Sequence, residues 1–303
     1  MKDLPFQYDH GVPLVFGGAM PHMPGFDEAA VVILPVPVDR TTSYVGGTRM
    51  GPHEILQASS HMELWDEEVR ADIHGVGLFT LPEMELPFGE MSAVVDEIER
   101  VAYEVIGRDK FLVALGGEHS ITPPLVSAAA RKFDKLSLLQ IDAHADMRDA
   151  YLGTVHSHAC AMRRSLQYAK ITQVGIRSLS TEEAAVLGHL NTSVFWDMDM
   201  RKDPAWIDRV VDTLQANVYV SIDVDGLDPA IMPATGTPEP GGLSWGEVTA
   251  LLRAVARHRT VVAADIVELS PIPGIVAPNF LCAKLIYKLL TYRFASDPRA
   301  KRL

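Results

Sequence analysis

The stretch Leu136–Asp146, which reads LSLLQIDAHAD, decides the fold. Its first part, Leu136–Ile141, is a short apolar run, typical of a strand that is covered on both faces in a parallel sheet. The run leads directly into Asp142, His144 and Asp146, with only alanines between them. Residues two apart on an extended chain point the same way, so these three side chains share one side of the strand end. Burying like charges together is costly unless a partner such as a divalent cation neutralises them, whereas a helix cap with salt bridges is the alternative interpretation.

Short apolar runs of the same kind recur along the chain, separated by amphipathic stretches. They are Val31–Val38, Phe111–Leu115, Ile171–Ile176, Val194–Met198, Val218–Val224 and Val261–Val267. This alternation predicts an α/β fold: a single three-layer α/β/α domain over residues 1–303, with an open, mostly parallel sheet. In such sheets ligands bind beyond the carboxyl ends of the strands, where the polar motifs lie.

The stretches between the runs carry helix signals. Apolar residues of Val94–Ile106 recur at spacings of one, three and four, which places them on one helical face. Thr122 followed by Pro123 suits a cap and a first turn. Two further helices are expected to begin at capping boxes, Ser180-x-x-Glu183 and Ser244-x-x-Glu247.

Composition narrows the class of protein. The 303 residues carry a formal net charge of −12, which argues against nucleic acid as a partner because phosphate binding needs basic patches. Cys160 and Cys282 form no CxxC pair and are expected to be reduced core thiols. Residues 1–18 have no signal-peptide pattern, and no stretch is apolar enough to span a membrane, so we expect a cytoplasmic protein.

Two further motifs repeat the pattern of the first. Val218–Ile222 leads into Asp223 and Asp225, again two residues apart, and the missing bidentate Glu excludes an EF-hand. His119 follows another apolar run, within the segment GGEHS. By itself the first of these motifs fits a turn as well as a metal site, and a lone histidine is more often a satisfied polar residue. Together, four aspartates and two histidines are too many for one small cation but suit two, and the thiol-free oxygen-rich set favours manganese over structural zinc.

At this point the motifs resemble those of a known family. GGEHS, DAHAD, SHACAMRR, SIDVDGLDPAIMPATGTPEPGGLSW and DIVELSP are similar to motifs of the ureohydrolases, which include arginases and agmatinases. The similarity runs from about Val31 to Phe294 in the family's motif order, and it is greatest to agmatinase. The segment Tyr44–Pro52 also recurs in the family, as a glycine-hinged loop near the mouth of the site or as a structural element.

The resemblance implies a site with two Mn²⁺ per chain. One ion would be held by His119, Asp142, Asp146 and Asp223, and the other by Asp142, His144, Asp223 and Asp225. It further implies that Glu268 binds the substrate guanidinium and that His158, rather than its neighbour His156, exchanges protons with bulk water. A homo-oligomer, hexamer or trimer, is also implied.

The activity implied is that of an agmatinase in polyamine biosynthesis. A metal-bridging hydroxide would attack the guanidinium carbon of agmatine, with Asp146 taking its proton, to give putrescine and urea. Arginases carry an Asn where this chain has Arg148. Arg148 could receive a substrate carboxylate, as in guanidinobutyrate, or pair with Asp149, and we expect the pairing. Guanidinobutyrase, aminopropylagmatine ureohydrolase and arginase remain alternatives within the family; outside it stand a single-zinc deacetylase of similar fold and a non-catalytic binding or regulatory subunit.

Overall fold

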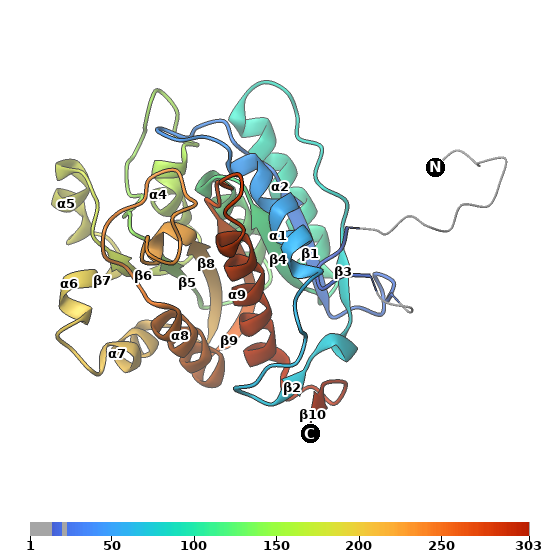
Figure 1. Ribbon diagram of the computed structural model, residues 1–303. Coiled ribbons are helices and arrows are strands. Elements are labelled where there is room, and N and C mark those ends of the chain that lie inside the picture. Colours follow the sequence, from blue (N-terminus) through green and yellow to red (C-terminus); the bar gives the residue numbers. More distant parts are fainter. Residues whose placement is uncertain (1–13, 20–22, 303) are drawn as a thin grey trace.

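A parallel sheet forms the centre of the molecule in the computed structural model, which describes residues 14–19 and 23–302 (Figure 1). Its eight strands are all parallel to their neighbours. Their spatial order is β3 (Leu78–Thr80), β1 (Val31–Val36), β4 (Phe111–Gly116), β9 (Thr260–Val267), β8 (Asn217–Asp223), β5 (Leu136–Ile141), β6 (Lys170–Ile176) and β7 (Thr192–Trp196). The predicted α/β fold with an open parallel sheet is confirmed.

Helices cover both faces of this sheet, so its strands contribute alternate residues to two hydrophobic cores. Ile33 belongs to the core shared with α1 (Gly51–Ser59), α7 (Trp206–Thr213), α8 (Trp245–His258) and α9 (Ala277–Phe294). Leu34 belongs to the core shared with α2 (Met91–Gly107), α3 (Thr122–Ala130) and α4 (Ala161–Ser165). The short helices α5 (Thr181–Leu187) and α6 (Asp197–Met200) flank the β7 edge (Figure 1).

Some strand boundaries differ from the prediction. Strand β1 ends at Val36 rather than Val38, because the Val38 amide turns back to the Val36 carbonyl. Strand β7 is only half-buried at the sheet edge, and Asp197, expected near its end, instead begins α6. Strand β3 was not predicted, because three residues are too short for a recognisable run. A separate two-stranded sheet pairs β2 (Ala71–Asp72) with β10 (Lys301–Arg302).

The helix predictions are mostly confirmed. The apolar face of α2 buries Val94, Ile98 and Ala102, and both capping boxes are formed at the starts of α5 and α8. The prediction for Thr122 is wrong by one residue: Ile121 is the N-cap of α3, and Thr122 is already helical. Its hydroxyl is used elsewhere, because it donates to Asp265 at 3.0 Å.

Five 3₁₀ turns complete the chain, and three of them carry residues predicted for the site. They are η1 (Thr48–Met50), η2 (His74–Val76), η3 (His119–Ile121), η4 (His158–Cys160) and η5 (Val224–Gly226) among the described residues. Each of η3, η4 and η5 follows extended backbone directly. A side chain at such a point leaves the line of the strand and can turn toward the space above the sheet.

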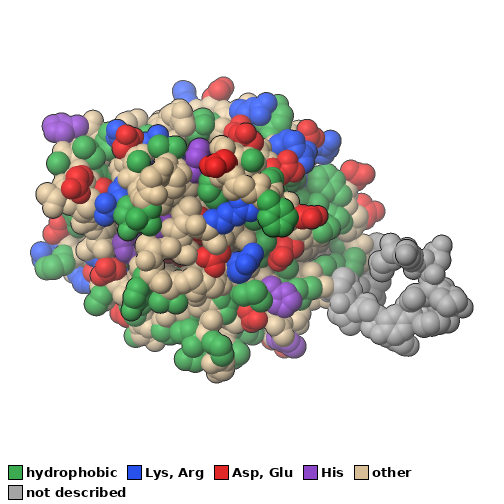
Figure 2. Space-filling view, turned by 90° about the horizontal axis from the view of Figure 1, so that it is seen from above, with side chains coloured by type: hydrophobic (Ala, Val, Ile, Leu, Met, Phe, Trp, Pro, Cys, Tyr) green, Lys and Arg blue, Asp and Glu red, His purple; other side chains and the backbone are tan. Residues whose placement is uncertain are grey.

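Other general predictions can be compared with the structure. Cys160 and Cys282 are free and buried, as expected. None of the helices in the described ranges is long and apolar enough to cross a membrane. Residues 1–13, where we predict no signal peptide, lie outside the described residues. On the face shown in Figure 2, acidic and basic side chains are interspersed.

The capping box of α8 gives a test of local stability. Ser244 accepts from the Glu247 amide at 3.3 Å, and Glu247 accepts in return from the Ser244 amide at 2.8 Å. We expect Ser244→Ala to lower the free energy of unfolding by about 1 kcal/mol, and Ser244→Gly by only a few tenths of that, because glycine lets water reach the helix end. Urea denaturation of the metal-free protein measures both; a Ser244→Ala variant as stable as the wild type would show that the cap contributes nothing.

Candidate metal centre

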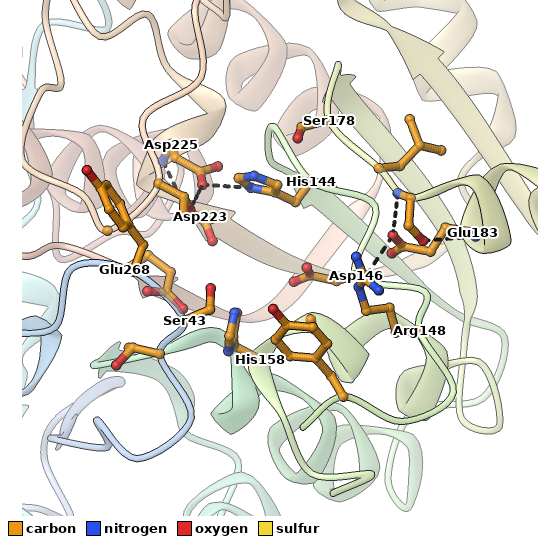
Figure 3. A pocket seen from close by; sticks show the side chains of 18 of the residues that line it. Ser43, His144, Asp146, Arg148, His158, Ser178, Glu183, Asp223, Asp225 and Glu268 are labelled. Atoms are coloured by element: carbon orange, nitrogen blue, oxygen red, sulfur yellow. Dashed lines mark hydrogen bonds and ion pairs between the residues drawn. The ribbon is translucent and has the colours of Figure 1, made fainter. Parts of the chain in front are cut away.

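The predicted site residues converge at the carboxyl ends of four adjacent central strands. In the order β4, β9, β8 and β5, these strands lead into His119, Glu268, Asp223 and Asp142. Parallel strands end at the same edge of a sheet, so residues far apart in sequence meet there. Figure 3 shows Glu268, Ser43 and His158 along one side of a cavity, with Asp225 and His144 along the other.

The cavity measures about 250 Å³. Six predicted site residues line it: His144, Asp146, His158, Asp223, Asp225 and Glu268. The remaining two, His119 and Asp142, are buried and do not line it. The structure therefore brings all eight predicted residues to one place, and it separates the two competing histidines. His156 does not line this cavity but a smaller depression next to Val155 and Arg164.

The first group that could hold a metal ion consists of His119, Asp142 and Asp223. The His119 Nδ1 atom lies 3.2 Å from a carboxylate oxygen of Asp142 and 3.4 Å from one of Asp223. Asp146 adds a third oxygen at 3.0 Å. Nevertheless this buried nitrogen forms no hydrogen bond of acceptable geometry with any of them. A nitrogen aimed between three carboxylates without bonding to one is the arrangement expected of a metal ligand, so these residues fit a divalent cation.

The second group consists of Asp142, His144 and Asp225. His144 Nδ1 lies 2.9 Å from Asp225 and 3.7 Å from Asp142. Asp142 thus belongs to both groups, as expected of a residue that bridges two ions. Asp223 falls only in the first group, so its bridging role stays a prediction.

Charge repulsion and burial set the protonation of this cluster. Burial, together with Asp225 and Asp146, raises the pKa of Asp142 to about 7, and burial with Asp225 and Asp142 raises that of Asp223 well above its usual range. Burial opposes ionisation of Asp225 as well, but the neighbouring His144 outweighs it and holds the Asp225 pKa at about 2. Burial also opposes the charged form of His144, which by itself would lower its pKa. The nearby Asp225 outweighs this effect and raises the pKa of His144 to about 11. A cation that binds here would compete with protons for these groups.

Two glycines are required by close approach of the backbone around the cluster. A Cβ atom on Gly117 would stand 1.8 Å from the carbonyl oxygen of Val38, and one on Gly226 would stand 2.7 Å from the Asp142 amide nitrogen. Both contacts are with backbone atoms just beyond the ends of β1 and β5, which cannot move aside as a flexible side chain could. The glycines of the GGEHS and DVDG segments are thus explained by packing.

Two of the acidic residues at the site have left-handed backbone conformations. Asp146 has a φ of 52° and Glu268 a φ of 66°. Such angles are rare for residues with a side chain, cost of order 1–3 kcal/mol, and cluster at functional sites. Glu268 is also 8% exposed and accepts from the His119 amide at 2.7 Å. Burial and the nearby Glu118 raise its pKa well above the usual range.

A buried hydrogen-bond network behind His119 was not predicted from the sequence. His119 Nε2 lies 2.9 Å from the Ser221 hydroxyl, which donates to Asp265 at 2.7 Å. Tyr219 and Thr122 donate to the other Asp265 oxygen at 2.7 and 3.0 Å. With Nε2 occupied in this way, Nδ1 is left to face the cluster. The available signal was an aspartate inside the otherwise apolar run Val261–Val267.

The expected pairing of Arg148 with Asp149 is wrong. Asp149 pairs with Arg163 and Arg164 instead. The Arg148 guanidinium reaches the other way, with its Nε 3.8 Å from a Glu183 carboxylate oxygen and its centre 4.8 Å from the Tyr151 ring (Figure 3). The backbone of this segment is bound to the chain near His158, since the Arg148 amide donates to the Ala159 carbonyl at 3.2 Å.

The loop near the mouth of the site lies partly where it was expected. Tyr44 and Val45 line the cavity, and the Gly46 carbonyl accepts from the Ser270 hydroxyl at 2.9 Å. The residues Gly46–Pro52 do not line the cavity. Tyr44 and Val45 therefore form part of the cavity wall, whereas Gly46 anchors the loop to Ser270.

Two candidate metal groups at the carboxyl edge of an eight-stranded parallel sheet place the protein in the arginase-like class of α/β proteins. Residues 29–291 match the sequence model of the family described as "Arginase family", so the chain belongs to that family. It is a ureohydrolase of the agmatinase branch, a hydrolase of guanidino compounds. This excludes the alternatives of a single-zinc deacetylase and of a non-catalytic subunit.

Similar proteins support the same placement. An N(1)-aminopropylagmatine ureohydrolase of Synechocystis sp. is 39% identical over 275 residues, 88% of this chain and 90% of that protein. An agmatinase of Bacillus cereus is 34% identical over 254 residues, 82% of this chain and 86% of that protein. The structure of agmatine ureohydrolase of Thermoplasma volcanium matches with a TM-score of 0.83 and 34% identity, covering 91% of this chain and 94% of that chain.

The protonation of the second group predicts how cation binding depends on pH. His144, with its pKa raised to about 11, must lose a proton at any neutral pH before it binds a cation, and Asp142 must lose one below its pKa of about 7. Affinity should therefore rise with pH, by at least about 10-fold per unit, and more steeply below pH 7. Titration calorimetry of the metal-free protein at pH 6.5, 7.0, 7.5 and 8.0 measures this slope. A flat profile would contradict it.

Proposed function

We propose that this protein binds two Mn²⁺ per chain and hydrolyses agmatine to putrescine and urea. The observation that carries the proposal is the complete ligand set at one sheet edge. Two histidines and four aspartates meet there, and Asp142 is common to both groups that could hold an ion. Oxygen-rich, thiol-free sites of this composition suit manganese.

Each predicted residue has a role that its position supports. His119, Asp142, Asp146 and Asp223 would hold one ion, and Asp142, His144, Asp223 and Asp225 the other. Bound Mn²⁺ supplies Lewis acidity and lowers the pKa of water at the site. The buried Glu268 carboxylate holds the guanidinium by charge-assisted hydrogen bonds, so that its carbon faces the attacking water.

Proton transfer falls to two residues that line the cavity. Asp146 accepts the proton of the attacking water and passes it to the departing amine. His158, which also lines the cavity but belongs to neither metal group, then exchanges a proton with bulk water. The products are urea and a primary amine.

The charges of the cavity support a substrate without a carboxylate. Two divalent ions would balance the four aspartates and leave Glu268 as the anionic partner of one guanidinium. Arg148 is the cation that could receive a substrate carboxylate, but Glu183 lies beside it and neutralises it. Agmatine, with a distal ammonium in place of an α-carboxylate, suits this arrangement better than arginine or guanidinobutyrate.

N1-aminopropylagmatine is the second candidate substrate, and the comparisons favour it. Relatives at 38–39% identity carry that activity in their names, whereas the agmatinases reach 34%. Both compounds present the same guanidinium to Glu268 and differ only at the distal amine, near the cavity mouth. We also propose a homo-oligomer, hexamer or trimer, as the family resemblance implies; light scattering of the purified protein tests it.

The metal proposal is tested by removing one charge from the cluster. Wild-type protein should contain two Mn²⁺ per chain and lose activity on chelation. In Asp223→Asn, metal content and urea release should fall together, because this aspartate is proposed to contact both ions. Asp199→Asn, an equivalent change at an exposed position, is the control and should keep both. One tightly bound zinc ion, or an Asp223→Asn variant with full metal content and kcat, would contradict the proposal.

The substrate proposal is tested by comparing kcat/KM on four compounds. An unpaired carboxylate entering the site should cost about 2–4 kcal/mol, so agmatine should exceed arginine and guanidinobutyrate by roughly 30- to 1,000-fold. Arg148→Ala should leave that order unchanged. Preference for a carboxylate substrate that disappears in Arg148→Ala would refute agmatine as the substrate. A higher kcat/KM on N1-aminopropylagmatine would instead select the second candidate.

A further inference from the structure

A buried carboxylate next to His119 has no role in the mechanism above. Glu118 is fully buried, yet it is neither a metal ligand candidate nor part of the cavity wall. Its two oxygens accept four hydrogen bonds. The donors are the amides of Arg40 and Thr41 at 2.7 and 2.6 Å, the Thr41 hydroxyl at 2.7 Å and the Ser120 hydroxyl at 2.6 Å. Each oxygen thus accepts two hydrogen bonds, which satisfies the polar atoms of this buried side chain.

The Thr41 hydroxyl connects Glu118 to His158. It accepts from the His158 amide at 3.0 Å, and it lies 3.2 Å from His158 Nδ1. A hydroxyl has one proton, and Thr41 gives it to Glu118, so its oxygen can only accept from the histidine. On this contact, the shorter of the two that Nδ1 makes, Nδ1 is the nitrogen that carries the hydrogen. Ser157 Oγ, at 3.4 Å from Nδ1, is a more distant partner that can also accept.

We propose that Glu118 is a positioning residue that fixes the tautomer and place of His158 through Thr41. With Nδ1–H donating to Thr41, the lone pair of the neutral ring resides on Nε2. That nitrogen is then the one that takes up and releases protons. The inference rests on the proposed proton-transfer role of His158, and it assigns which atom performs the transfer and what orients it.

The remaining contacts of the histidine agree with a ring held in one place. The Tyr151 ring meets that of His158 edge to face, with centroids 6.1 Å apart and planes at 88°. Arg148 stacks on the same tyrosine, so the ring that supports His158 is itself held. These contacts restrict the ring plane but are indifferent to the tautomer, which leaves that choice to Thr41 and Glu118.

The test removes the Thr41 hydroxyl while keeping its shape. Thr41→Val should lower kcat for urea release by roughly 10- to 100-fold, at or below the lower end of general acid–base contributions. KM, manganese content and the melting temperature should change little. Thr41→Ser restores the hydroxyl and should recover most of the lost kcat. Ser120→Ala removes a hydroxyl that donates to Glu118 but does not contact His158, so it is the matched control and should keep most of the wild-type kcat.

A double-mutant cycle separates positioning from general damage. His158→Ala should lower kcat by roughly 10²-fold, and adding Thr41→Val to it should lower kcat no further, because the residue being positioned is gone. Equal losses from Thr41→Val with and without His158 would overturn the inference, as would a loss of manganese or a Thr41→Val variant with normal kcat. If His158→Ala itself keeps full activity, its proposed proton-transfer role fails first, and the inference falls with it.

Discussion

Mutual repulsion of buried carboxylates is the constraint around which this structure is built. Asp142, Asp146, Asp223 and Asp225 are each at most 6% exposed and meet at a single sheet edge. Other groups of the protein compensate part of this repulsion. Backbone amides donate to three of these side chains, and His144 lies against Asp225. The remaining repulsion raises the pKa values of Asp142 and Asp223. In addition, the Nδ1 atom of His119 has no hydrogen bond. Cations bound at the two candidate metal groups would remove these costs.

The parts that the sequence predicted share one property: their signals are local. A strand buried on both faces is apolar throughout, and the closely spaced Asp142, His144 and Asp146 directly after it are a local pattern that indicates a cation site. The capping boxes at Ser180 and Ser244 are equally local, because donor and acceptor lie three residues apart. The prediction that all these motifs meet needed only the rule that parallel strands end together.

The predictions that failed concern side chains with a choice of distant partners. Thr122 could cap its own helix, but a buried Asp265 more than a hundred residues away is the stronger acceptor. Arg148 could pair with the adjacent Asp149, yet its guanidinium lies beside the carboxylate of Glu183 instead. The choice of His158 over His156 did not fail, but it came from the family motif and not from spacing; only the fold shows that His158 lines the cavity and His156 does not. In each case the deciding contact depends on tertiary structure that no short pattern contains.

The position of β9 in the sheet has a consequence for how the protein is made. It is the last of the eight strands in sequence but lies near the middle, between β4 and β8. Without it, the sheet consists of two half-sheets, β3-β1-β4 and β8-β5-β6-β7, each with an open edge. His119 belongs to one half and the four aspartates to the other. On the ribosome, the two halves of the centre therefore exist before they are joined. They are joined only when the last quarter of the chain emerges and β9 inserts between β4 and β8. Until then, the edges of β4 and β8 carry unpaired backbone N–H and C=O groups that could pair with other chains.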